Sequence, residues 1–208
     1  MKHLRILLIF SSLFLTNSLL MAFDTENIDP KELSLVDSLQ RYVEQYAQSN
    51  PDNVLEFAGK METMASKSKY KLLEARALNA QASVYYYKKD NKRAARYFEK
   101  ELSILEKLGN VNELADSYFN LATLYFSINK MKDAAEYYEK SLEFVRKKGN
   151  KEMELQLLER LALTYEKREK YKQAFGFYQQ YVNINEEKKT QQVENEVFTL
   201  RSKISEEK

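Results

Sequence analysis

The 208-residue sequence predicts an all-α fold in which pairs of helices stack one after another along the chain. Small and aromatic residues recur at a spacing of 40 residues, which is typical of a stacked helical array. The composition also favours helices nearly throughout, with only 4 Gly and 2 Pro. The recurring sets are Ala82, Ala122 and Ala162; Tyr85, Tyr125 and Tyr165; Ala94, Ala134 and Ala174; Phe98, Tyr138 and Tyr178; and Leu102, Leu142 and Val182.

Residues 1–22 differ from the rest of the chain and have the features of a secretory signal peptide. Lys2 and Arg5 precede an apolar run over residues 6–15, and Ala22 is a suitable last residue before cleavage. The alternative is a retained membrane anchor, because the whole apolar segment approaches the roughly 20 residues that span a bilayer. We therefore expect an exported protein of the bacterial envelope, either periplasmic or secreted.

Residues 29–71 are predicted to form an atypical first helix pair. Asp29-Pro30 and Asn50-Pro51 each combine an N-cap residue with a proline at the first helical position. The apolar faces of the two expected helices consist of Leu35, Leu39, Val43 and Tyr46, and of Leu55, Ala58, Met61 and Ala65. Little else of the recurring pattern is present, as expected of a terminal, degenerate repeat with one unstacked face.

Three regular helix pairs are predicted over residues 72–110, 111–150 and 151–187. Gly109 and Gly149 lie one period apart, where each of the first two pairs should end in a left-handed residue. Within each pair, the recurring alanines mark places where two helix backbones approach closely, and the aromatic residues fill the space beside them. Neither helix can bury its apolar stripe alone, so each pair needs neighbours.

The last segment, 188–208, has two interpretations. No glycine ends the fourth pair, so a helix is expected to continue through the polar residues 186–192. Apolar residues then follow at spacings of 4, 3 and 4: Val193, Val197, Leu200 and Ile204. Because a coiled coil needs about three or four heptads, we favour a helix that folds back to cap the stack. A coiled-coil helix that forms a homodimer through 188–208 is the alternative.

With these residues the chain resembles the tetratricopeptide repeat (TPR) family, in a 40-residue variant of a unit that usually has about 34. The similar segments are LNAQASVYYYKKDNKRAARYFEKEL, YFNLATLYFSINKMKDAAEYYEKSL and LERLALTYEKREKYKQAFGFYQQYV. The resemblance implies a right-handed superhelical solenoid of about four helix-turn-helix repeats with an extended C-terminal helix. The chain departs from the family pattern at Leu78 and Tyr118, where Trp is frequent, and no Pro closes a repeat.

The sequence argues against an enzyme and against a bound metal or cofactor. The only histidine, His3, lies in the leader, and cysteine is absent, so nucleophile–His pairs and thiolate metal sites are excluded from the rest of the chain. The four glycines stand singly and form no phosphate-binding loop. A net charge of +2 gives no electrostatic case for binding nucleic acid. Contact with a membrane is expected only through an uncleaved leader.

The resemblance implies that a protein or peptide partner binds along the first helices of successive repeats, which line the concave face in this family. Carried over by register, the binding positions are Arg76, Asn79, Ser83, Tyr86, Phe119, Asn120, Thr123, Phe126, Gln156, Glu159, Arg160 and Leu163. This mixture of aromatic and polar residues suits an extended or helical peptide. For Tyr86, Phe119 and Phe126, the alternative is packing against neighbouring first helices.

Two classes of function follow from these observations. The first is a non-catalytic, exported TPR scaffold that holds a partner in its concave groove. The second is a sensory or regulatory TPR module that transmits a change through its C-terminal helix, because the chain also resembles the exported sensory region of bacterial TPR sensor kinases. No kinase motif accompanies that resemblance, and the sequence does not identify the partner.

Overall fold

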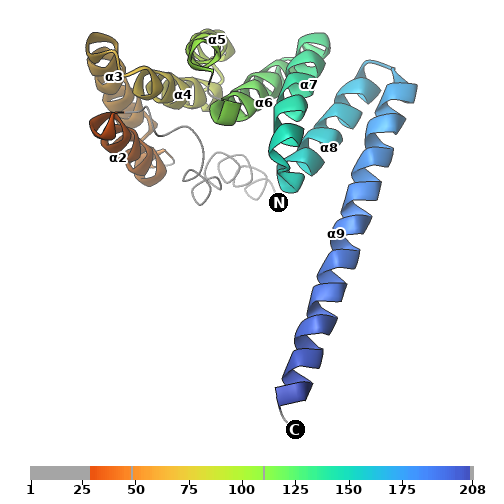
Figure 1. Cartoon of the computed structure of the whole chain (residues 1–208). Coiled ribbons are helices and arrows are strands. Elements are labelled where there is room, and N and C mark those ends of the chain that lie inside the picture. The colour runs from red at the N-terminus through yellow and green to blue at the C-terminus, as the bar shows by residue number, and fades with distance from the viewer. Residues whose placement is uncertain (1–28, 48, 110, 207–208) are drawn as a thin grey trace. The chain divides into compact units, whose positions relative to one another are not determined.

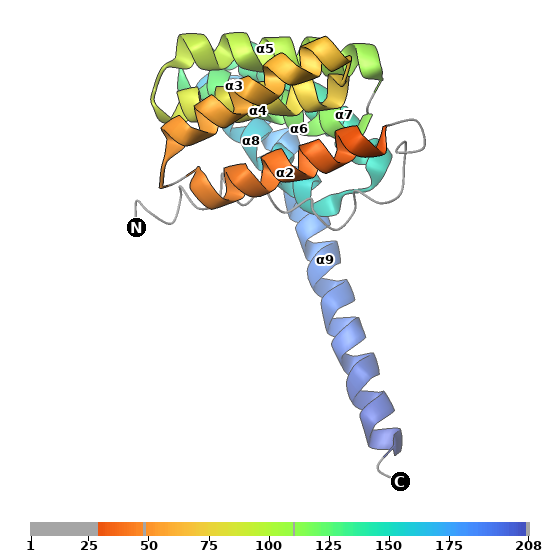
Figure 2. The ribbon, with the colours of Figure 1, turned by 90° about the vertical axis from the view of Figure 1, so that its left-hand side faces the viewer.

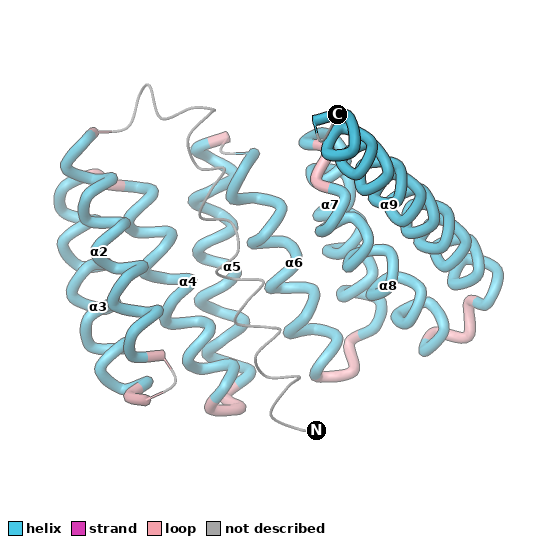
Figure 3. Tube along the Cα trace, turned by 90° about the horizontal axis from the view of Figure 1, so that it is seen from below, coloured by secondary structure: helices cyan, strands magenta, loops and turns pink. Residues whose placement is uncertain are grey.

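The computed structural model describes residues 29–47, 49–109 and 111–206, and within these ranges the chain forms helices and turns without a strand (Figure 3). The predicted leader lies outside the described residues. The described helices are α2 (Pro30–Tyr46), α3 (Pro51–Ser68), α4 (Lys71–Tyr87), α5 (Asn91–Leu108), α6 (Val111–Ser127), α7 (Met131–Lys148), α8 (Lys151–Lys167) and α9 (Tyr171–Glu206). The predicted all-α fold and the order of helix pairs are confirmed.

The chain divides into two compact units, Met1–Leu124 and Tyr125–Lys208, with the boundary inside α6. In the first unit, α4 packs against α3 and α5, and α2 lies against both α3 and α4 (Figure 2). In the second unit, α7 packs against α8, and α8 packs against α9. Each unit therefore consists of successive helices that bury their apolar faces against one another.

Left-handed residues end helices at regular intervals. Gly109 and Gly149 follow α5 and α7 with φ angles of 63° and 70°, as the sequence predicts. Lys89, Asn129 and Glu169 have φ angles of 62°, 63° and 58° in the turns inside the three regular pairs, which the sequence analysis does not predict. These turns recur at the same 40-residue step, so each regular pair reverses direction with the same backbone geometry.

The recurring alanines and aromatic residues form the core of the second and third repeats. Ala94 and Ala134 are fully buried, and the side chains of Phe98 and Tyr138 are only 4% and 0% exposed. This confirms the close helix crossings predicted for these repeats. In the fourth repeat the equivalent Tyr178 is 56% exposed, because α9 has no later helix packed against this face among the described residues.

Each regular repeat also joins its two helices through a stacked pair of aromatic rings. The ring centroids are 5.4 Å apart for Tyr85 and Tyr97, 5.6 Å for Tyr125 and Tyr137, and 5.4 Å for Tyr165 and Phe177. A cation lies over the first ring of each pair: Arg93 at 4.4 Å, Lys130 at 5.3 Å and Arg168 at 4.9 Å. These contacts add cation–π attraction to the apolar packing beside each turn.

The first helix pair begins as predicted but buries a different face of α2. The side chains of Asp29 and Asn50 accept hydrogen bonds at the starts of α2 and α3, which confirms both N-caps. The buried residues of α2 are Glu32, Val36 and Leu39, whereas Leu35 is only half-buried. Glu32 turns inward because its Oε1 accepts a hydrogen bond of 3.1 Å from the backbone N–H of Leu73, in the first turn of α4.

The C-terminal helix α9 is a single helix of 36 residues from Tyr171 to Glu206 (Figure 1). Its first part forms the second helix of the fourth repeat, and the helix then runs on far beyond the end of α8. The predicted continuation through residues 186–192 is confirmed. The predicted fold-back of 188–208 is wrong, because an unbroken helix has no turn at which this segment could reverse.

Candidate protein-binding surface

The twelve predicted binding residues lie on the first helices of the three regular repeats, α4, α6 and α8. The first unit contains seven of them and the second unit contains five, which are Phe126, Gln156, Glu159, Arg160 and Leu163. None of the twelve is fully buried, and Glu159 and Leu163 are exposed. All of them therefore retain surface that a partner could contact. The residues on α4, α6 and α8 differ in the contacts that their side chains already make.

On α4, Arg76 and Asn79 are already engaged with carboxylates of the same unit. Arg76 Nη2 donates to Glu113 Oε1 at 2.6 Å, and Asn79 Nδ2 lies 3.0 Å from both carboxyl oxygens of Glu101. Glu101 and Glu113 are only 3% and 8% exposed. These bonds tie α4 to α5 and α6, so a peptide carboxylate would have to compete with buried internal acids for Arg76.

The acidic cluster around Arg76 changes the protonation of Glu101. The pKa of Glu101 is raised to about 8: burial is the largest cause, the Asn79 hydrogen bond and the Arg76 charge partly offset it, and the nearby acids Glu113 and Asp116 add to the rise. For Arg76, burial lowers the pKa, but the charges of Glu113, Asp116 and Glu101 outweigh it and the net pKa is raised. At neutral pH, Arg76 is thus a cation held among acids, of which Glu101 is mostly protonated.

The other predicted residues of the first unit are half-buried: Ser83, Tyr86, Phe119, Asn120 and Thr123. Tyr86 contacts its neighbour Tyr87 edge-on at 5.8 Å, and Lys89 lies 5.7 Å from its ring. Thr123 Oγ1 donates to the backbone carbonyl of Phe119 at 2.9 Å, within α6. These local contacts leave part of each side chain accessible.

In the second unit, Phe126 and one face of α8 form the more accessible part of the predicted surface. Lys167 Nζ, on α8, lies 5.8 Å from the ring of Phe126, which is half-buried. Four residues spaced along one face of α8 follow: Gln156, Glu159, Arg160 and Leu163. Within the described residues, the side chains of these four have no ion pair or side-chain hydrogen bond, and Leu163 is 40% exposed. We refer to Phe126 and these four residues as the α8 surface.

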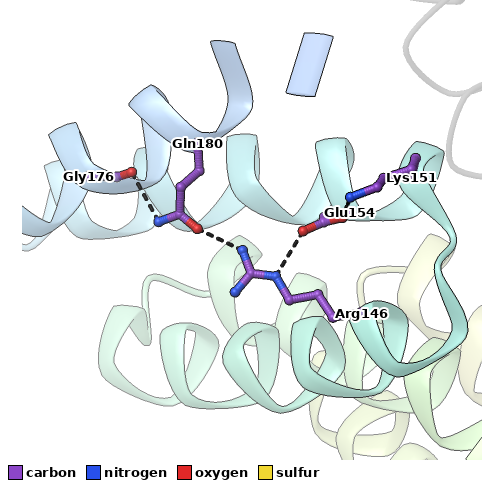
Figure 4. A network of polar contacts seen from close by, with 5 residues as sticks. All are labelled: Arg146, Lys151, Glu154, Gly176 and Gln180. Atoms are coloured by element: carbon purple, nitrogen blue, oxygen red, sulfur yellow. Dashed lines mark hydrogen bonds and ion pairs between the residues drawn. The ribbon is translucent and has the colours of Figure 1, made fainter. Parts of the chain in front are cut away.

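A polar network fixes α8 against its neighbours on another side (Figure 4). Arg146 donates to Glu154 at 2.8 Å and to Gln180 at 2.6 Å, and Lys151 contacts Glu154 at 3.1 Å. Burial tends to raise the pKa of Glu154, but the hydrogen bonds and charges of Arg146 and Lys151 lower it overall. The network joins α7, α8 and α9, so the α8 surface is presented on a firmly held helix.

These polar networks do not follow from the 40-residue pattern, although the sequence contains one sign of the first of them. Glu101 lies 40 residues before Ser141, and both are buried in the second helices of their repeats. A charged residue at a position where the next repeat holds a small buried residue indicates a buried acid. Recognising its partners Arg76 and Asn79 would have required knowledge of how α4 packs against α5.

The described residues contain no candidate metal site. Within them, no three side chains of His, Asp or Glu are grouped as a metal site would require. Nor does any of the described helices have the combination of length and apolar character that crossing a bilayer demands.

A family model for the tetratricopeptide repeat matches residues 73–147 and, in a second overlapping match, residues 113–187. The chain belongs to the tetratricopeptide repeat family. The two matches overlap by one helix pair and together cover the three regular repeats, so family and geometry identify the same units. No protein of curated function matches this chain.

Several solved structures share the TPR fold at low sequence identity. BtubC (BKLC) from P. vanneervenii is 16% identical with a TM-score of 0.67, over 80% of this chain and 68% of that one. RapI in its apo form is 17% identical with a TM-score of 0.67, over 79% of this chain and 60% of RapI. The TPR-like repeats of a Podospora anserina protein described as a kinesin light chain are 17% identical with a TM-score of 0.62, over 76% of each chain. These likenesses confirm the predicted solenoid fold class.

Proposed function

We propose that this chain is a non-catalytic TPR scaffold, exported from the cytoplasm, which binds a protein or peptide partner along the first helices of its repeats. Membership of the TPR family supports the general class, because stacked helix pairs present extended surfaces for other chains. The charged start and apolar run of residues 1–22 support export to the periplasm or beyond.

One observation carries the proposal for the binding surface. The four α8 residues of the α8 surface make no side-chain polar contact with the described part of the chain, although they include an acid, a base and an amide. By contrast, Arg76 and Asn79 at the corresponding face of α4 are engaged with Glu113 and Glu101. We therefore place the main contacts of the partner on the α8 surface, with Leu163 and Phe126 as apolar anchors and Arg160 as the basic group.

The test is crosslinking in the native envelope, followed by quantitative capture of the identified partner by the purified chain. Phe126→Ala combined with Arg160→Glu should lower capture strongly, because it removes an apolar anchor and reverses a charge on the same surface. Lys132→Glu is the matched control, since this exposed lysine belongs to α7, the second helix of its repeat. Equal capture by the double variant and the unchanged chain would refute the α8 surface.

A second candidate function is a sensory or regulatory module that acts through α9. The observation that favours it is the length of α9, which continues well beyond the repeat to which it belongs. Light scattering tests this function by measuring the mass of the chain with and without residues 188–208. The full chain is expected to form a larger assembly than the shortened one. A monomer in both cases would contradict it.

A further inference from the structure

The first half of α9 presents an aromatic face to solvent. Tyr171, Phe175 and Tyr178 are 65%, 62% and 56% exposed. One period earlier, in α7, the positions equivalent to the last two hold Ala135 and Tyr138, which are 1% and 0% exposed where α7 packs against α8. The face that α7 buries inside the stack is thus open on α9, and it holds more aromatic surface than a soluble helix needs to expose.

This face continues along the rest of α9 as a single line of positions, which we call the α9 stripe. Its positions follow the spacing 4, 3, 4 three times over: Tyr171, Phe175, Tyr178, Val182, Glu186, Lys189, Val193, Val197, Leu200 and Ile204. This is an 11-residue repeat of about 3.67 residues per turn, close to the helix period, so the stripe stays on one side of a nearly straight helix. Only the two central positions are charged.

The spacing 4, 3, 4 reads the same from the N-terminal end of the α9 stripe as from its C-terminal end. The stripe is therefore symmetric about a midpoint between Glu187 and Lys188. If a second copy of α9 lies antiparallel across this midpoint, every stripe position meets a stripe position. Position 182 lies opposite 193, 178 opposite 197, 175 opposite 200, and 171 opposite 204. Each aromatic residue of the first half is then placed against an aliphatic position of the second half.

The charges at the centre also match in this arrangement. The segment Glu186-Glu187-Lys188-Lys189 is complementary to itself when reversed, so Glu186 lies opposite Lys189 and Glu187 opposite Lys188 of the other copy. A parallel pair would instead place Lys189 against Lys189 within the stripe, which is unfavourable. The charge pattern therefore selects the antiparallel orientation.

From these observations we infer that two copies of this chain associate through antiparallel α9 helices, paired along the α9 stripe from Tyr171 to Ile204. The paired length is about 50 Å at 1.5 Å per residue. The pairing uses the outward side of α9, so it leaves the contact between α8 and α9 intact. It does not depend on the α8 surface, and the two proposals can fail separately.

The first experiment measures the mass of the purified full chain by sedimentation equilibrium over a range of micromolar concentrations. A dimer is expected, and Tyr178→Glu should raise its dissociation constant by at least about tenfold, because an aromatic contact is lost twice per dimer. The matched control is Phe198→Glu, since Phe198 is 73% exposed but lies more than a third of a turn, about 130°, from the centre of the α9 stripe. A monomeric unchanged chain, or equal weakening by both variants, would overturn the proposal.

The second experiment tests the orientation and remains informative if Tyr178→Glu impairs folding. The chain has no cysteine, so single introduced cysteines report disulfide formation without background. Val182→Cys and Val193→Cys should each fail to crosslink alone but should form a covalent dimer when the two proteins are mixed under oxidising conditions. Crosslinking of Val182→Cys with itself would indicate a parallel pair and overturn the antiparallel one. The variant with Phe126→Ala and Arg160→Glu should dimerise like the unchanged chain, which would show that the dimer does not depend on the α8 surface.

Discussion

Replacing the buried acid Glu101 by glutamine should stabilise the protein at neutral pH. Glu101 is 3% exposed, and its pKa is raised from 4.5 to about 8, with burial as the largest cause. Between these values the folded chain holds a proton that the unfolded chain releases. The free energy of unfolding therefore falls as the pH rises through this range. The stability that the bound proton contributes is fully present only below pH 4.5.

The magnitude follows from the width of this interval. Each pH unit corresponds to about 1.4 kcal/mol, so raising the pH from 4.5 to 7 costs the folded state on the order of 3 kcal/mol at this site. Glu101→Gln cannot ionise and keeps a polar group beside Asn79, whose amide can present its oxygen to the new side chain. The variant should therefore exceed the unchanged protein in stability by about 3 kcal/mol at pH 7 and by almost nothing at pH 4.

The assay is urea unfolding of both proteins at pH 4, 5.5, 7 and 8, followed by the helical circular dichroism signal. The difference between the two free energies should grow with pH up to about 8 and then level off. Glu99→Gln, at an exposed position of the same helix, controls for the removal of one negative charge. A difference between Glu101→Gln and the unchanged protein that stays constant from pH 4 to 8 would refute the reasoning.

Three further changes test the packing, the turns and the polar network. Ala134→Leu should lower the free energy of unfolding by about 1–3 kcal/mol in denaturant titrations, because this fully buried alanine lies at a close helix crossing; an unchanged midpoint would show that the crossing has spare room. Gly149→Ala should cost about 1–2 kcal/mol through its φ of 70° alone, since no atom lies within 4 Å of the added Cβ, and Gly59→Ala in a helix interior is the control without that cost. Arg146→Ala should destabilise the protein by about 1–3 kcal/mol at pH 7. Because Arg146 lowers the pKa of Glu154, the part of this loss that comes from the ion pair should shrink as the pH falls below 4.5, while the part from the hydrogen bond to Gln180 remains; a loss independent of pH would exclude the ion pair as its cause.

The order and the ends of the helices could be predicted because their signals are local. Asp29 and Asn50 precede prolines and cap α2 and α3, and Gly109 and Gly149 adopt the left-handed conformation that the end of a helix requires. Each of these effects depends on a few neighbouring residues. The 40-residue period then placed the buried alanines, because one crossing geometry repeats along the chain.

The features that could not be predicted depend on contacts between helices. Nothing near Lys89 in the sequence indicates a positive φ, which arises because α4 and α5 must reverse over a short turn. The engagement of Arg76 by Glu113 depends on how α4 packs beside α6, 37 residues away in sequence. Register alone could therefore assign the predicted binding positions to the first helices, but it could not distinguish side chains with internal polar partners, such as Arg76, from side chains without them, such as Arg160.

The capping of α4 by Glu32 makes the first regular repeat depend on the atypical pair before it. Tyr70, at the N-cap of α4, makes no capping hydrogen bond with its side chain, and the N–H of Leu73 donates instead to the carboxylate of Glu32, 41 residues earlier. Proteolytic trimming that reached Glu32 would strip α4 of this acceptor and fray its opening turn. In an N-terminal truncation series, removal of residues 1–28 should accordingly leave protease resistance unchanged. Truncations that also remove part of α2 should lower it sharply.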